Sequence, residues 1–310
     1  MDKVLDSDVN KRKTVIIFSI LGIGALFVIA HFLGLTESES KTLSAFEQHQ
    51  IRFDINVPDT NISRDMYLNL KAAIAVDNQT KDVLYCYNAK ELRAVASISK
   101  LLTAMVVIDH YQPDSILTIT KLDAKRSARS LFRTGDRARL EDFLHAALLQ
   151  SDNRSARALA RNVAGSYEKF AEMMNKKAEE IGLNNTVMYE PTGLDERNCS
   201  NAADIVRILN VIVSHYPEIS NITSKKRHSF KLLNRNKTVN LINTNKMVFS
   251  KYKVLAGKTG YIIESDYCLA TILENADGKQ ISVVVLGSPG PQTRFREARR
   301  LANYAFNKAG

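Results

Sequence analysis

The stretch AVASISKLLTAM, residues 94–105, is the part of the chain that says most about its fold. From Ile98 onward, apolar residues recur at helical spacing, which predicts a helix with a buried face. Ser97 falls in the first turn of this helix, and Lys100 follows three positions later. Because side chains three apart lie on one helix face, we expect the Lys100 amine to reach the Ser97 hydroxyl.

Ser97 and Lys100 have a chemical and a structural interpretation. A serine hydroxyl becomes a strong nucleophile when an adjacent base takes its proton. A lysine can be that base when burial or a second cation lowers its pKa. The free N–H groups at a helix N-terminus also favour developing negative charge. Taken alone, however, the pair is better explained by the structural interpretation, in which Ser97 is a helix N-cap and Lys100 a solvated residue of the first turn.

A second polar motif, Ser151-Asp152-Asn153, lies between two apolar helical runs, residues 143–149 and 156–163. This position predicts a short loop between helices, with its side chains facing a cleft. The Ser151 hydroxyl is suited to relay a proton to a leaving amine, and Asn153 to hydrogen-bond a substrate amide. In isolation, an ordinary turn that caps a helix is the better interpretation of the tripeptide.

A third motif, Lys258-Thr259-Gly260, lies within the segment VLAGKTGYII, residues 254–263, which predicts a strand. Its two glycines suit a strand that another backbone approaches closely. Lys258 would attract a substrate carboxylate, and Thr259 would add a hydroxyl. The backbone N–H groups of Ser97 and Tyr261 are expected to form an oxyanion hole. A phosphate-binding loop is excluded because Tyr252 stands where that motif needs glycine.

In this order and at these separations, the three motifs match the S-x-x-K, S-D-N and K-T-G set of serine acyl-transferases. The chain resembles the low-molecular-mass penicillin-binding proteins, the D-alanyl-D-alanine carboxypeptidases and endopeptidases. Three further segments are similar to that family: YEPTGLD at 189–195, NCSNAAD at 198–204, and Asn243-Thr244-Asn245. The resemblance covers roughly residues 66–310. The chain departs from the family pattern at Asp152. Glycine or serine is more usual at this position in these peptidases, and Ser-Asp-Asn is the motif of class A β-lactamases.

The resemblance implies a serine D,D-peptidase that cleaves peptidoglycan peptides through an acyl-enzyme and is inhibited covalently by β-lactams. It implies no cofactor. It assigns the site residues as nucleophile (Ser97), general base (Lys100), proton relay (Ser151) and substrate-binding groups (Asn153, Lys258, Thr259, Gly260, Tyr261). The chain ends soon after its last predicted helix, without a second domain or an amphipathic anchor. Family members of that form favour endopeptidase over carboxypeptidase activity.

Two alternatives remain open on the sequence. A β-lactamase needs a base that activates water for deacylation, and Glu190 lies in roughly the region where class A enzymes carry one. A non-catalytic β-lactam or cell-wall sensor would keep Ser97 and Lys100 but is normally joined to several membrane helices. Only one such helix is predicted here.

The N-terminus predicts a membrane anchor. Residues 14–35 are apolar, with His31 the only ionisable residue, and are long enough to cross a bilayer as a helix. Lys and Arg residues at 11–13 precede the run, so the positive-inside rule places residues 1–13 in the cytoplasm. Residues 36–65 would be an extracytoplasmic linker, and residues 66–310 the D,D-peptidase domain. The expected location is the inner membrane, with the catalytic domain on the periplasmic side.

The order of predicted elements indicates an α+β fold. Strands are expected at 71–77 and 83–87 and again at 254–263, 267–273 and 281–286. Three helices are expected between 140 and 181, the clearest at 167–181, with further helices at 203–215 and 293–307. The terminal strands would form one antiparallel sheet flanked by helices, and the helical middle a separate all-helical lobe. This is the β-lactamase/transpeptidase-like architecture, with the active site between sheet and lobe.

Charge and cysteine content narrow the possible partners. The net charge of +10 suits a polyanion such as a cell wall rich in carboxylates. No nucleic-acid partner is expected, because no binding motif accompanies the basic stretches at 225–227 and 294–300. The three cysteines, Cys86, Cys199 and Cys268, form no C-x-x-C pair, and no zinc-binding spacing is present. A metal enzyme is therefore excluded.

Overall fold

The computed structural model describes residues 51–62, 66–110, 115–125 and 130–309. The predicted cytoplasmic segment and membrane helix, residues 1–35, lie outside these ranges, as does most of the predicted linker. No helix in the described ranges is long and apolar enough to cross a membrane. Ahead of the predicted domain boundary, Ile55 and Val57 are buried, and Ile62 pairs with Cys86.

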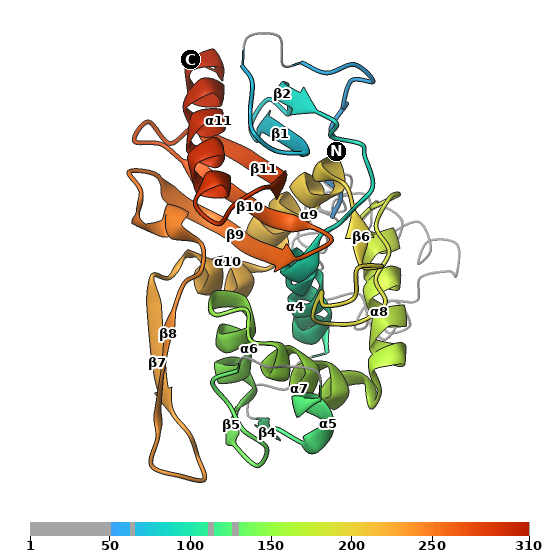
Figure 1. The fold of residues 1–310 in the computed structure, drawn as a ribbon, viewed down its shortest axis with the longest axis vertical. Helices are drawn as coiled ribbons and strands as arrows, with labels where there is room; N and C mark the ends of the chain where they lie inside the picture. Colours follow the sequence, from blue (N-terminus) through green and yellow to red (C-terminus); the bar gives the residue numbers. More distant parts are fainter. Residues whose placement is uncertain (1–50, 63–65, 111–114, 126–129, 310) are drawn as a thin grey trace, which may run out of the picture. The chain divides into compact units, whose positions relative to one another are not determined.

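Strands from both ends of the chain form one antiparallel sheet, as predicted (Figure 1). Its order is β2-β1-β11-β10-β9. The bounds are β1 (Ala72–Asp77), β2 (Val83–Tyr87), β9 (Lys253–Ile262), β10 (Asp266–Glu274) and β11 (Gln280–Ser288). The first strand pairs with the last in the register Ala72↔Leu286 to Asp77↔Ile281. Strand β9 is left at one edge of this sheet.

Helices cover both faces of the sheet. The C-terminal helix α11 (Thr293–Ala309) packs Phe295 and Leu301 against the face that carries alternate residues of β11, such as Val283. On the opposite face, the Asn210 amide of α9 (Ala202–His215) donates to Ser282 Oγ at 2.9 Å. Because successive strand residues point to opposite faces, covering both faces buries the whole strand. This explains why β11 is buried from Ile281 to Ser288.

The middle of the chain forms the predicted helical lobe. Its helices include α4 (Lys100–Asp109), α6 (Leu140–Leu149), α7 (Asn153–Ala164) and α8 (Tyr167–Glu180), with α5 (Lys121–Ala124) and α10 (Pro217–Ser224) beside them. The three helices predicted between 140 and 181 are confirmed. Side chains of Asp152 and Ser166 cap α7 and α8 by accepting hydrogen bonds from backbone N–H groups.

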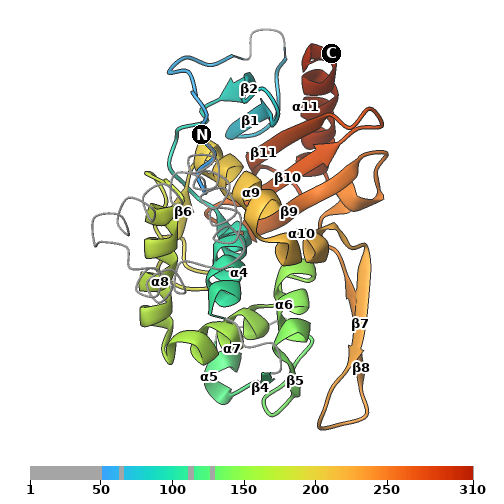
Figure 2. The ribbon, with the colours of Figure 1, turned by 180° about the vertical axis from the view of Figure 1, so that it is seen from behind.

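Three two-stranded sheets complete the described structure. They are β3 (Arg93–Ala94) with β6 (Cys199–Ser200), β4 (Ile116–Thr118) with β5 (Arg137–Arg139), and β7 (Arg227–Lys231) with β8 (Thr238–Ile242). The β7–β8 hairpin extends as a long arm away from the main sheet, as the view from behind in Figure 2 also shows. Sequence analysis did not identify this hairpin, because its strands are short and half-exposed.

Candidate active site

Ser97 lies in a 3-10 turn, η1 (Ala96–Ser99), that leads directly into α4. The sequence predicts the α-helix from Ile98, whereas the structure begins it at Lys100. The cause is the backbone before it. Ala96 adopts a φ of +47°, and the Ile98 N–H bonds back to the Val95 carbonyl at 3.2 Å, which tightens the first turn.

The Lys100 amine is buried and faces the Ser97 hydroxyl. Its Nζ donates to Ser97 Oγ at 2.9 Å and to Asn153 Oδ1 at 2.7 Å, and it also contacts the carbonyl oxygen of Thr192. Burial of the side chain lowers the pKa of Lys100 to about 8, while the negative charge of Glu190 opposes this shift. The neutral form of Lys100 is therefore more accessible near neutral pH than that of an exposed lysine.

The Ser151-Asp152-Asn153 motif forms the predicted turn between α6 and α7. Ser151 has a φ of +59°, and its Oγ accepts from the Lys258 amine at 2.9 Å. The Asp152 carboxylate accepts from Ser155 N at 2.8 Å and from Ser130 Oγ at 2.6 Å. Asp152 thus caps α7 and ties down the preceding loop, while the side chains on either side of it face the two lysines.

The Lys258-Thr259-Gly260 motif lies on the edge strand β9. The Lys258 ammonium is almost fully buried. Burial, followed by the charges of Lys100 and Arg294, moves the pKa of Lys258 well below its usual value. The Thr259 hydroxyl lies 2.8 Å from the Thr244 hydroxyl. This bond connects the Asn243-Thr244-Asn245 segment to the strand.

Gly260 brings β9 against the nucleophile turn. A Cβ atom added there would lie 2.7 Å from the Val95 carbonyl oxygen and 3.3 Å from the Ser97 nitrogen. Only glycine leaves room for this approach, which no short-range sequence pattern reveals. The neighbouring Tyr261 is half-exposed, and its ring stacks on Tyr267 with centroids 4.1 Å apart.

Glu190 organises the loop that faces Lys100. Its carboxylate accepts from Thr192 N at 2.8 Å, Thr192 Oγ1 at 2.6 Å and Leu194 N at 2.9 Å, and also from Gly193 N. These bonds hold the loop in the shape that presents the Thr192 carbonyl to the Lys100 amine. The Glu-Pro-Thr-Gly-Leu motif identified this loop in the sequence, but the motif does not show which atoms the Glu190 carboxylate binds.

Arg294 is a further cation at the site that sequence reasoning missed. Its Nη1 donates to the Gly260 carbonyl at 3.0 Å, directly behind the Lys258 motif. Its Nε is buried and has no hydrogen-bond partner among the described residues. The sequence placed Arg294 in a dense basic stretch, which resembles an ordinary solvated helix face. Only the packing of α11 behind β9 distinguishes it.

The assembled site is a cluster of polar and cationic side chains. Lys100, Lys258 and Arg294 form no ion pair with a carboxylate in the part of the chain that the structure describes. Such uncompensated charge suits the binding of an anion. The described residues also contain no group of three or more His, Cys, Asp or Glu side chains placed to hold a metal ion.

Comparisons with known proteins identify the family of the chain. The family profile described as D-alanyl-D-alanine carboxypeptidase matches residues 60–290. A D-alanyl-D-alanine endopeptidase of Pseudomonas aeruginosa is 34% identical over 251 residues, which cover 80% of each chain. A D-alanyl-D-alanine endopeptidase of Escherichia coli is 34% identical over 239 residues, covering 75% of this chain and 76% of its own.

A solved structure shows the same fold. Penicillin-binding protein D2 of Listeria monocytogenes, in its cefotaxime-bound form, aligns with a TM-score of 0.69 at 27% identity. The alignment covers 78% of this chain and 99% of the Listeria chain. The chain belongs to the D-alanyl-D-alanine carboxypeptidase family and is a serine D,D-peptidase with a transpeptidase-like α+β fold.

Proposed function

We propose that Ser97 is the nucleophile and Lys100 its general base in the hydrolysis of D-alanyl peptide bonds of peptidoglycan. The observation that carries this proposal is the buried Lys100 amine, 2.9 Å from Ser97 Oγ and with its pKa lowered to about 8. A base whose pKa lies near the working pH combines a useful neutral fraction with a real affinity for the proton.

The reaction proceeds in two stages. Neutral Lys100 takes the Ser97 proton while Oγ bonds to the substrate carbonyl carbon, and the backbone N–H groups of Ser97 and Tyr261 stabilise the oxyanion. The C–N bond then breaks as the leaving amine receives the proton that Lys100 took, relayed through the Ser151 hydroxyl, and Lys100 becomes neutral again. This leaves an acyl ester on Ser97. Water attacks the ester carbon and gives a proton to Lys100. The bond between the carbonyl carbon and Ser97 Oγ then breaks as Lys100 returns that proton to Oγ, which releases the carboxylic acid product.

Lys258, Thr259 and Arg294 are suited to hold a carboxylate of the substrate. The Lys258 amine donates to Ser151 Oγ, the Thr259 hydroxyl lies 2.8 Å from the Thr244 hydroxyl, and Arg294 adds charge through the Gly260 carbonyl. Asn153 and the edge of β9 that pairs with no further strand of the sheet, including Gly260, would bind the peptide backbone of the substrate.

We favour cleavage of peptide cross-links over removal of a terminal D-alanine, because both curated relatives described above are named endopeptidases. The test is digestion of a cross-linked muropeptide dimer and of a pentapeptide monomer, followed by chromatography of the products. An endopeptidase converts the dimer to monomers. Release of D-alanine from the pentapeptide with an intact dimer would establish a carboxypeptidase instead.

The structure gives Glu190 a role other than that of a β-lactamase base. Its carboxylate is occupied by backbone and hydroxyl groups of its own loop. It is therefore poorly placed to activate water, so a penicillin adduct on Ser97 should persist. A sensor would also retain the adduct, but it would leave muropeptides uncut.

The first experiment is intact-mass analysis of the full chain after brief exposure to benzylpenicillin, with Ser97→Ala as control. A lasting gain of one drug mass, absent from the control, supports the acyl-enzyme. Hydrolysed drug without an adduct would indicate a β-lactamase. Intact drug without an adduct would contradict the acyl-serine mechanism.

We also propose that residues 14–35 anchor the chain in the inner membrane, with the catalytic domain on the periplasmic side. The apolar run and the preceding basic residues support this topology. Fractionation of cells should place the full chain in the membrane pellet. Externally added protease should degrade the domain in spheroplasts. Recovery of the full chain in the soluble fraction would contradict the anchor.

A further inference from the structure

The positive charge of the chain is concentrated in one segment. Residues 225–253 hold nine Lys and Arg residues and no Asp or Glu, in a chain whose net charge is +10. This segment folds into the β7–β8 hairpin, the 3-10 turn η2 (Lys246–Phe249) and the start of β9. The proposed reaction uses none of these cations.

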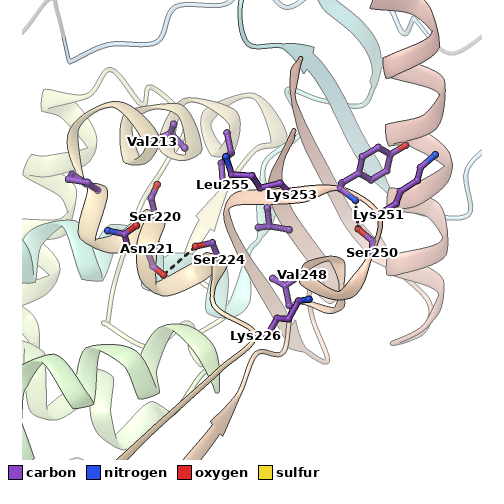
Figure 3. Close-up of a pocket in the computed structure, with 13 residues that line it drawn as sticks. Val213, Ser220, Asn221, Ser224, Lys226, Val248, Ser250, Lys251, Lys253 and Leu255 are labelled. Carbon is purple, nitrogen blue, oxygen red and sulfur yellow. Dashed lines mark hydrogen bonds between the residues drawn. The ribbon is translucent and has the colours of Figure 1, made fainter. Parts of the chain in front are cut away.

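Three of these lysines line a cavity of about 750 Å³ between α10 and the start of β9. They are Lys226, Lys251 and Lys253. Figure 3 shows them with Ser220 and Asn221 of α10, and in this view the Lys251 side chain extends away from that helix. None of the 13 lining residues is acidic. A volume of this size falls within the usual range of ligand sites.

The lining of the cavity also combines a hydrogen-bonding group with apolar side chains. Ser220 Oγ is buried and has no hydrogen-bond partner within the described ranges. The apolar part of the lining includes Val213, Val248 and Val254. Amide, hydroxyl and ammonium groups beside aliphatic side chains match a short peptide that carries carboxylates and methyl groups better than they match a uniformly polar ion.

Two of the three lysines at the cavity are free to meet a ligand. The Lys226 ammonium lies over the Phe249 ring and the Lys251 ammonium over the Tyr252 ring, and neither forms an ion pair within the described structure. Lys253 does pair with Glu274, at 2.8 Å on the surface. All three lysines are exposed.

Strand β9 connects this cavity to the active site. Lys253 begins the strand at the cavity, and Lys258 follows five residues later beside Ser151. At roughly 3.3 Å per residue, the two positions are about 17 Å apart along the strand. An extended peptide of about five residues spans the same distance.

We propose that the cavity between α10 and β9 is a second binding site for a carboxylate-bearing peptide of peptidoglycan, the uncleaved strand of a cross-linked substrate. This proposal rests on the peptidase function proposed above and adds a second substrate-binding site to it. Two anchoring points on one strand would favour a branched, cross-linked peptide over a single short one, because the second contact is intramolecular once the first has formed.

The kinetic test compares two variants with equal charge change. One is Lys226→Gln/Lys251→Gln/Lys253→Gln. The control is Lys121→Gln/Lys169→Gln/Lys176→Gln, which removes three exposed lysines of the helical lobe. We expect KM for a cross-linked muropeptide dimer to rise about tenfold in the first variant, while kcat and the rate of acylation by benzylpenicillin stay unchanged. An unchanged KM, or an equal rise in the control, would overturn the proposal.

A binding measurement separates this site from the chemistry. Ser97→Ala in the full chain is titrated with the muropeptide dimer, with and without the three cavity substitutions. Weaker binding in the cavity variant supports the proposal even if Ser97 proves not to be acylated by penicillin. Equal binding of the dimer would overturn it. The same two proteins are also titrated with a linear phosphate polymer. If the cavity substitutions weaken the binding of this polymer but not that of the dimer, the proposal is overturned, because the cavity then binds a different polyanion.

Discussion

Lys100 shows how opposing effects are balanced on one side chain. Removal from water disfavours its charged form, whereas the nearby charges of Glu190 and Asp152 favour it. The oxygen atoms of Ser97, Asn153 and Thr192 accept hydrogen bonds from the amine and fix its position. Burial prevails, so the amine loses its proton more readily than an exposed lysine does while still facing the nucleophile.

The rate of acylation should therefore follow the titration of Lys100. Only the neutral amine can take the Ser97 proton, so the rate should rise as the pH increases toward about 8 and level off above it. Stopped-flow measurement with a chromogenic β-lactam between pH 6 and 9.5 gives the profile. A rate that does not change over this range would contradict a lysine base.

Glu190 should act on the reaction through Lys100. Glu190→Gln removes the charge that raises the pKa of Lys100, so the inflection of the acylation profile should move to lower pH. Glu190→Ala also removes the acceptors that shape the loop, and it should reduce the acylation rate about tenfold or more. Glu196→Gln, at an exposed position of the same loop, is the control. A profile identical to that of the control would show that Glu190 is merely structural.

Strand β9 is the element that brings the motifs together. Its outer edge faces the helical lobe, so that Lys258 meets Ser151 and Gly260 meets the nucleophile turn. The opposite edge pairs with β10 in the register Gly260↔Cys268 and Lys258↔Ala270. The same strand is therefore held rigidly on one side and presents its polar residues on the other.

A methyl group on Gly260 should disrupt this arrangement. In Gly260→Ala the new carbon would lie 2.7 Å from the Val95 carbonyl oxygen, so the strand and the turn must separate. A shift of this kind in a catalytic site costs about a hundredfold in rate. We expect that loss in the acylation rate with benzylpenicillin. Tyr261→Phe keeps the backbone N–H and should acylate normally, and an equal loss in that control would contradict the assignment.

The molecule as a whole is stabilised by its covered sheet. Strands β1 and β11 come from opposite ends of the described domain and lie side by side at its centre. Helix α11 covers them with Phe295, Leu301 and neighbouring alanines. This apolar layer lies on the sheet face away from α9, so its packing contributes stability. The residue of α11 that reaches the site is Arg294, at the start of the helix.

Leu301→Ala should lower stability and leave the chemistry intact. Leu301 is fully buried, and truncation of such a leucine typically lowers the free energy of unfolding by about 2–5 kcal/mol. Urea denaturation should show a lower midpoint with an unchanged slope. Arg299→Ala, on the exposed side of the same helix, should unfold like the unmodified chain. A normal midpoint for Leu301→Ala would contradict the packing described here.

Local sequence patterns predict the elements of this fold and the residues of its motifs. Helical and strand periodicity identified α8, α9, α11 and the strands of the main sheet, because each pattern depends on neighbours a few positions apart. The order of Ser97-x-x-Lys100, Ser151-Asp152-Asn153 and Lys258-Thr259-Gly260 was enough to suggest the family. Each of these features is local or is read directly along the chain.

The remaining features depend on contacts between residues distant in sequence. Thr192 O reaches Lys100 across 92 positions, and Lys258 reaches Ser151 across 107. Arg294 was hidden among basic residues until α11 placed it behind Gly260. The lysine cavity forms only where the start of β9 meets α10. These arrangements could not be predicted from the sequence alone, because burial, close approach and unpaired charge depend on how the elements pack together and no local pattern records that packing.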